Sequence, residues 1–361
     1  MTMRVKMLKK FAFIVFVFCI LWGELAESQS LFSNCYPDKK QKCDVESADG
    51  LPWETKIRFF LFTRKNSKEP EHLHLCNGTL PKDSHFNPKN RLYVFIPGFK
   101  FGVCELEMIP IVKEELLERG DYNVLLMDCT DEYGTDFIDS MKHTKKASTT
   151  IARVLKNIQV KTGLKNEDVY LIGHSLGTHV SGMVGQLFKV KRITALDPAG
   201  VTYTKELPLD QRLDVSDAEI VDVIHTNGGK GLPYLGLSFP IGHFDFYVNG
   251  GILQPSCSHS IWDGIKNFNV LYVVGVSLVP SLCAHMQAVE YYKITINNRH
   301  GKFIGVPCNS YRSFKGNNCT VSGPNVTMGF DLEESITPEV ISKEPPRKYY
   351  LDTTSTYPYV K

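Results

Sequence analysis

The feature that most constrains the fold is a glycine-rich turn at residues 173–177, Gly-His-Ser-Leu-Gly, between a predicted strand and a predicted helix. The apolar run 169–172 precedes it, and apolar residues recur at helical spacing from 178 to 189. A serine in this setting projects its hydroxyl at the carboxyl edge of a parallel sheet, while the glycines let neighbouring backbone pass close by. The turn therefore predicts that Ser175 is a nucleophile. A glycine-rich turn with a solvent-facing serine is the alternative.

Short apolar runs elsewhere have the length of buried parallel strands. They are Tyr93–Ile96, Val124–Met127, Ile193–Leu196 and Ile220–Ile224. A helical pattern lies between two of them, with one apolar face over residues 151–158 and Gly163 as its cap. This alternation predicts an α/β fold, a mostly parallel sheet with helices on both faces. The rhythm is lost after about residue 297, where we expect an irregular, disulfide-bearing tail with a few antiparallel edge strands.

A serine nucleophile needs a base, and the base needs an acid that orients it. The acid should end a strand beyond Ser175, and Asp197 directly follows the run 193–196. Any of five later histidines could be the base: His225, His243, His259, His285 and His300. His285 is the leading candidate because it lies two residues after Cys283, in a loop that a disulfide could hold, before an apparent helix. The pattern alone leaves the other four open.

Two aimed backbone N–H groups are needed to stabilise an oxyanion. One is the N–H of Leu176, the residue after the predicted nucleophile. The other should come from a glycine-containing loop after an early strand, and Phe99 follows Pro97-Gly98 at the end of the run 93–96. We therefore predict Phe99 and Leu176 as the two donors.

Residues 1–28 have the pattern of a secretory signal peptide, with a basic start, a short apolar run and a small-residue cleavage site. An N-terminal membrane anchor is the alternative. Residues 29–361 are then predicted to form a single secreted, extracellular domain. The net charge of +2 gives no reason to expect a nucleic-acid partner.

Secretion also changes what the ten cysteines indicate, because an oxidising compartment favours disulfides. Cys19 leaves with the signal peptide, and the odd number that remains leaves a free thiol or an intermolecular bond. Three Asn-x-Thr sequences predict glycosylation at Asn77, Asn318 and Asn325.

From about residue 52 to 329 the chain resembles the pancreatic lipase family, which includes the phospholipases A1 of insect venoms. The matching motifs are Gly-His-Ser-Leu-Gly at 173–177, Leu-Asp-Pro-Ala-Gly at 196–200, Arg-Leu-Asp-Val-Ser-Asp-Ala at 212–218, Val-Asp-Val-Ile-His-Thr at 221–226, Asp-Phe-Tyr at 245–247 and Gln-Pro-Ser-Cys at 254–257. The resemblance implies the α/β-hydrolase fold and a Ser175, Asp197 and His285 triad, because the family's histidine follows a Cys-x-His pattern matched at 283–285.

The resemblance also implies disulfides and a metal site. The family's lid lies between cysteines that match Cys257 and Cys283, and venom enzymes pair cysteines that would be Cys35 and Cys129. We further predict a Cys308–Cys319 disulfide in the tail. No cofactor is required, but a structural calcium ion is implied at Asp214 and Asp217. A solvated acidic loop is the alternative.

The apolar end of the lid segment, residues 268–279, indicates a cover that meets lipid, or else a buried strand. Two departures from the family are Pro97, where a histidine is usual, and Cys129, where a tryptophan is usual. The implied function is hydrolysis of glycerolipid acyl esters at a membrane, droplet or micelle surface, by a monomer. The long lid favours a triacylglycerol lipase. The segment 128–133 and an apparent end where a second domain would begin favour a phospholipase A1. A non-catalytic lipid-binding homologue is the alternative from another class.

Overall fold

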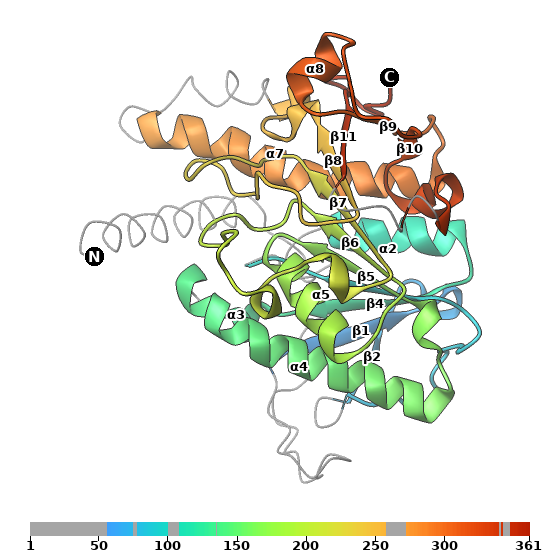
Figure 1. Ribbon diagram of the computed structural model, residues 1–361. Coiled ribbons are helices and arrows are strands. Elements are labelled where there is room, and N and C mark those ends of the chain that lie inside the picture. Colours follow the sequence, from blue (N-terminus) through green and yellow to red (C-terminus); the bar gives the residue numbers. More distant parts are fainter. Residues whose placement is uncertain are drawn as a thin grey trace.

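The computed structural model describes residues 56–74, 78–99, 108–134, 136–257, 272–338, 341 and 347–361. Within them, eleven strands form one sheet in the order β10-β9-β11-β8-β7-β6-β5-β3-β4-β1-β2 (Figure 1). The strands are β1 (Arg58–Phe62), β2 (Glu71–His72), β3 (Leu92–Ile96), β4 (Asn123–Asp128), β5 (Val169–His174), β6 (Arg192–Leu196), β7 (Ile220–His225), β8 (Phe244–Val248), β9 (Ile304–Pro307), β10 (Val326–Thr327) and β11 (Arg347–Leu351).

The centre of the sheet is parallel from β4 through β3, β5, β6, β7 and β8 to β11. The outer strands run antiparallel to their neighbours. Every residue of the five predicted strands lies in one of these central strands, which are buried on both faces as their continuous apolar runs predict. Their carboxyl ends therefore meet at one edge of the sheet.

Helices cover both faces, as the alternation predicts. They are α2 (Met108–Arg119), α3 (Thr130–Tyr133), α4 (Phe137–Thr162), α5 (Leu176–Leu187), α7 (Tyr272–Asn297) and α8 (Tyr311–Lys315). Apolar side chains of α4 and α5 form one core cluster with the sheet, and those of α2 and α7 form another. Consecutive residues of β3 alternate between these clusters, with Val94 in the first and Phe95 in the second. The sheet thus separates two hydrophobic cores.

The tail extends the same sheet. The strands β9 and β10 are antiparallel, as predicted, but β11 lies parallel to β8 and continues the central part of the sheet. The predicted disulfide Cys308–Cys319 is present in this region. The described part of the chain contains no helix that is long and apolar enough to cross a membrane. The predicted signal peptide lies outside the described residues.

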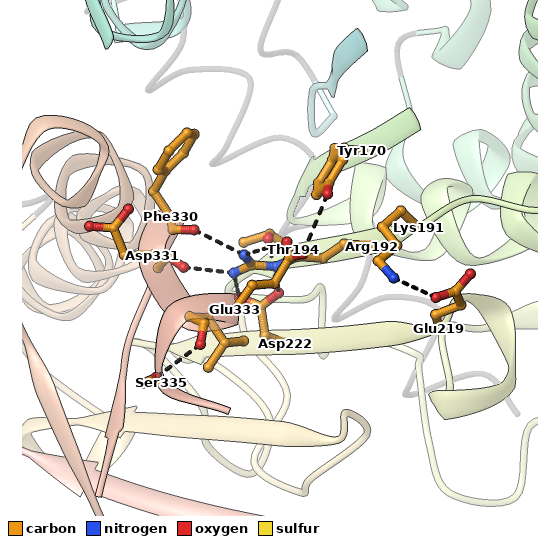
Figure 2. A network of polar contacts seen from close by, with 12 residues as sticks. Tyr170, Lys191, Arg192, Thr194, Glu219, Asp222, Phe330, Asp331, Glu333 and Ser335 are labelled. Carbon is orange, nitrogen blue, oxygen red and sulfur yellow. Dashed lines mark hydrogen bonds and ion pairs between the residues drawn. The ribbon is translucent and has the colours of Figure 1, made fainter. Parts of the chain in front are cut away.

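A buried polar network fastens the tail to the amino end of the central strands (Figure 2). Arg192, which begins β6, donates to both carboxylate oxygens of Asp222 in β7, at 2.7 and 2.9 Å. It also donates to the backbone carbonyls of Gly329 and Phe330, at 2.7 and 3.1 Å. Thr194 donates to Asp222 as well. A charged pair buried this deeply is tolerable because nearly every donor has an acceptor.

The helix α7 corrects one expectation. His285 was expected in a loop before a helix at about residue 286, but α7 begins at Tyr272 and includes it. Buried positions recur every three or four residues from Ser281 through Tyr292, so the helical pattern extends back through the disulfide. The alternative of a buried strand for the apolar segment is wrong from Tyr272 onward. Residues 258–271 of the predicted lid lie outside the described residues.

Candidate active site

Ser175 lies at the turn between β5 and α5, with backbone angles φ 54° and ψ −119°. This left-handed conformation is rare for a residue with a side chain and marks a strained turn. Close packing explains the glycine at 177, since a Cβ there would lie 2.1 Å from the carbonyl oxygen of Ile96. The turn therefore has the geometry predicted for a nucleophile, and its serine is largely buried, at 7% exposure.

Asp197 follows β6 directly and is fully buried, also with a positive φ of 40°. Its Oδ1 accepts hydrogen bonds from the backbone N–H groups of Thr226 and Asn227, at 2.8 and 2.9 Å. Its Oδ2 faces His285 Nδ1 at 2.5 Å. The two oxygens thus have separate partners, and the carboxylate can hold one orientation of the His285 ring.

The structure selects His285 among the candidate histidines that it describes. The disulfide Cys257–Cys283 is present two residues before it in α7. His225 bonds to Asp245, His243 accepts the N–H of Val221, and His300 is exposed. His259 lies outside the described residues. Only His285, within the described ranges, meets the predicted acid.

His174, the residue before Ser175, packs against the ring of His285. The two ring centroids are 4.8 Å apart, and His174 Nε2 lies 3.4 Å from the carbonyl oxygen of His285. Burial, and then the neighbouring His285, hold the pKa of His174 well below its ordinary value. A neutral His174 can donate to that carbonyl and pack against the ring without adding a second charge.

The two predicted oxyanion donors lie on adjacent segments. Leu176 is the first residue of α5. The loop that carries Phe99 continues from β3, and the carbonyl groups of Ile96 and Pro97 contact Gly177. The ring of Phe99 packs edge-on against Phe137, with centroids 5.6 Å apart. Pro97 lies before this contact and leaves the N–H of Phe99 intact.

The sequence patterns did not predict which groups hold the carboxylate of Asp197 in place. Thr226 and Asn227 hold Asp197 through their backbone N–H groups, and His225 forms a buried pair with Asp245 beside them. The motifs at 221–226 and 245–247 contain these residues except Asn227, and the one role considered for any of them was that of His225 as a candidate base. The motifs were the available signal, because each places a polar residue at the end of, or within, an apolar strand.

The two predicted calcium ligands lie together at a short 3₁₀ turn. Asp214 accepts the N–H of Ser216, and Asp217 accepts the N–H of Asp214 and a hydrogen bond from Gln186. The buried Oδ2 of Asp214 has no hydrogen-bond partner among the described residues. Burial, and to a smaller extent the charge of Asp214, raise the pKa of Asp217 to about 7, against the hydrogen bonds from Asp214 and Gln186 that lower it. Two desolvated carboxylates fit a cation, although the described residues contain no metal-binding group of three or more acidic, histidine or cysteine side chains.

The predicted Cys35–Cys129 disulfide is wrong. Cys129 is a free thiol, fully buried in the core at the end of β4, where it lies with Tyr133 in one core cluster. Burial raises the pKa of its thiol far above the ordinary value. Cys35 lies outside the described residues. The position where the resemblance expects a tryptophan thus holds a buried thiol, which burial makes unreactive.

Two of the three predicted glycosylation sites are described, and both Asn318 and Asn325 are exposed. Asn77 lies outside the described residues. Exposure is what attachment of a glycan requires.

Comparisons with known proteins match most of the chain. A family model described as Lipase matches residues 24–359. Pancreatic lipase-related protein 2 of Mus musculus is 33% identical over 289 residues, which cover 74% of this chain and 56% of the relative. Phospholipase A1 member A of Mus musculus is 33% identical over 354 residues, which cover 94% of this chain and 71% of the relative. Pancreatic triacylglycerol lipase of Cavia porcellus is 29% identical over 304 residues, which cover 79% of this chain and 62% of the relative. The chain thus spans little more than half the length of the first of these relatives.

Proposed function

Because the chain belongs to the lipase family, with the α/β-hydrolase fold, we propose that it is a secreted serine esterase that hydrolyses acyl esters of glycerolipids. The observation that carries this proposal is the buried contact between His285 Nδ1 and Asp197 Oδ2, in a structure that also holds Ser175 at a strained turn. Nothing in this arrangement calls for a cofactor in the chemical step.

The first half of the reaction transfers the acyl group to the enzyme. The Oγ of Ser175 attacks the ester carbonyl carbon while Nε2 of His285 takes its proton, and Asp197 stabilises the imidazolium that forms. The N–H groups of Phe99 and Leu176 donate to the oxygen that becomes negative. Collapse of the intermediate breaks the ester C–O bond, and His285 returns the proton to the departing alcohol. Water then attacks the acyl-enzyme by the same steps and frees the fatty acid and Ser175.

Within this class we favour the sn-1 ester of phospholipids. The similarity to phospholipase A1 member A extends over 94% of this chain, against 79% and 86% for two pancreatic triacylglycerol lipases. Segment 128–133 supports the same choice, because Cys129 stands where the resemblance expects tryptophan. A triacylglycerol lipase is the second candidate, favoured by the 26-residue separation of Cys257 and Cys283 around the lid.

A purified protein should release a lysophospholipid that keeps the sn-2 chain from phosphatidylcholine, faster than it releases fatty acid from triacylglycerol. Mass spectrometry of the products from a lipid with two different acyl chains measures both the rate and the position. If triacylglycerol is cleaved faster than phosphatidylcholine, the protein is a triacylglycerol lipase and not a phospholipase A1. If wild type cleaves neither and matches Ser175→Ala, the non-catalytic lipid-binding alternative stands instead.

We also propose that Asp214 and Asp217 hold a structural calcium ion, together with backbone carbonyl oxygens of the same segment. The support is the unpartnered Oδ2 of Asp214 and the desolvated carboxyl of Asp217 beside it. Bound there, the ion would neutralise two buried negative charges. Its role would be stability of the segment after β6 rather than chemistry at Ser175.

Calcium should therefore raise the melting temperature of the wild type, and a chelator should lower it. The Asp217→Asn variant removes one ligand charge and should lose this calcium response. Scanning calorimetry with calcium, with magnesium and with chelator measures the response. An equal response in the variant, or none in the wild type, would exclude this site.

A further inference from the structure

A second histidine–aspartate pair lies beside the candidate triad. His225 ends β7 and Asp245 lies in β8, and both are fully buried. His225 Nε2 is 2.8 Å from Asp245 Oδ1, and Nδ1 is 3.1 Å from the carbonyl oxygen of Leu237. The ring stacks on Tyr247 with centroids 4.3 Å apart and planes 6° apart. The geometry leaves the ring no freedom to turn.

Both ring nitrogens of His225 face acceptors. The carbonyl oxygen of Leu237 can only accept, so Nδ1 carries a proton. The Asp245 carboxyl group also accepts the backbone N–H groups of Ile241 and Gly242, at 3.0 and 2.9 Å. Each ring nitrogen of His225 thus has its own oxygen partner, and the pair is buried and fully hydrogen-bonded. We call residues 227–241 the covering loop. The His225–Asp245 pair contacts this loop at Leu237 and at its last residue, Ile241.

The covering loop lies directly on the acid of the triad. Gly236 packs so closely on Asp197 that a Cβ there would lie 2.5 Å from Oδ2. The next residue, Leu237, donates its N–H to the carbonyl oxygen of Pro198 at 2.8 Å. The same Leu237 presents its own carbonyl oxygen to His225. One residue thus connects the buried pair to the turn that follows Asp197.

The backbone gives a second connection. His225 is followed immediately by Thr226 and Asn227, whose N–H groups hold Oδ1 of Asp197. A shift of the His225 ring would therefore disturb the carboxylate from two sides, through the covering loop at Oδ2 and through its own backbone at Oδ1.

We propose that His225, held by Asp245, is a positioning residue for the triad, which fixes Asp197 in the place where it orients His285. This inference rests on the proposed function, because it assigns the pair a role in that reaction. It predicts that loss of the pair lowers the rate of the chemical step without weakening substrate binding.

The test compares Asp245→Asn with Asp222→Asn. Both replace a fully buried aspartate that pairs with a buried basic side chain on a neighbouring strand, but the side chain of Asp222 lies on the other face of the sheet, where it pairs with Arg192 at the start of β6. Per folded protein, Asp245→Asn should lower kcat by about 10²-fold at unchanged KM, the effect of misplacing a catalytic group by about 1 Å. Asp222→Asn should leave kcat and KM near wild type. Near-UV circular dichroism gives the folded fraction of each.

A second readout does not depend on activity. The proton between His285 Nδ1 and Asp197 should give a low-field proton NMR signal in the wild type and in Asp222→Asn, and should lose or shift it in Asp245→Asn. If Asp245→Asn does not fold, His225→Gln serves in its place, and Thr194→Val replaces Asp222→Asn.

Equal kcat in the two variants, or an unchanged low-field signal in Asp245→Asn, would overturn the inference. A wild type without Ser175-dependent hydrolysis would instead overturn the proposed function, while the NMR comparison would still decide whether the pair positions Asp197. The two failures are therefore distinguishable.

Discussion

Replacing Asp197 by asparagine is expected to lower kcat by about 10⁴-fold, with KM nearly unchanged. The structure dictates how the amide must lie. Oδ1 accepts two backbone N–H groups, from Thr226 and Asn227, so the amide oxygen has to take that place. The amide nitrogen then faces His285 Nδ1, where a carboxylate oxygen lies at 2.5 Å in the wild type. Two donors cannot share that contact, so the ring is held as the tautomer with a proton on Nε2, which cannot take the serine proton.

Steady-state kinetics on a water-soluble ester would measure this loss, together with melting curves that establish folding. The double variant with Ser175→Ala should be no slower than Ser175→Ala alone, since residues that act as a unit are not additive. An Asp197→Asn enzyme that keeps more than about a tenth of wild-type kcat would contradict the role of Asp197, because loss of a triad acid costs orders of magnitude more.

Replacing Asp222 by asparagine is expected to lower the free energy of unfolding by about 3 kcal/mol, at the lower end of the range for breaking a buried ion pair. The variant leaves the Arg192 guanidinium, whose side chain is 4% exposed, without its bidentate carboxylate. Two backbone carbonyls and Glu333, at 3.6 Å, remain to compensate part of the charge, which is why we expect the lower end.

Urea unfolding followed by circular dichroism would measure the change. A matched control lies in the same view (Figure 2), because Lys191 pairs with Glu219 at 2.6 Å on the exposed surface. Lys191→Gln should cost less than about 1 kcal/mol, since water screens an exposed pair. If the two variants lose similar free energies of unfolding, burial does not determine how much the Arg192–Asp222 pair stabilises the protein.

The sequence predicted those parts of the site that depend on local order along the chain. Ser175 could be predicted because strand, turn and helix are adjacent around it. Asp197 followed because parallel strands bring their carboxyl ends to one edge. His285 needed the resemblance, because several histidines follow Asp197 and periodicity alone did not separate them.

The remaining parts depend on contacts between distant residues. The His225–Asp245 pair arises because β7 and β8 pair in a register that aligns His225 with Tyr247, and no local pattern contains that register. The free thiol of Cys129 is a similar case, since the resemblance implied a disulfide partner and only the packing with Tyr133 shows that the thiol is buried in the core. The parallel placement of β11 was missed because the tail has no regular pattern, and a local pattern does not indicate the direction in which a strand pairs.

The position of β11 has a consequence for biosynthesis. It pairs in parallel with β8, which lies about a hundred residues earlier, and the carbonyls of Gly329 and Phe330 complete the shell around Arg192. While the chain is being made, one side of β8 keeps its backbone N–H and C=O groups unpaired until residues 347–351 leave the ribosome. Arg192 likewise lacks two of its hydrogen-bond acceptors until Gly329 and Phe330 have been made. Such an open strand is a site for wrong association between nascent chains. The sheet therefore closes late, and correct folding depends on chain segments that lie far in sequence from the triad.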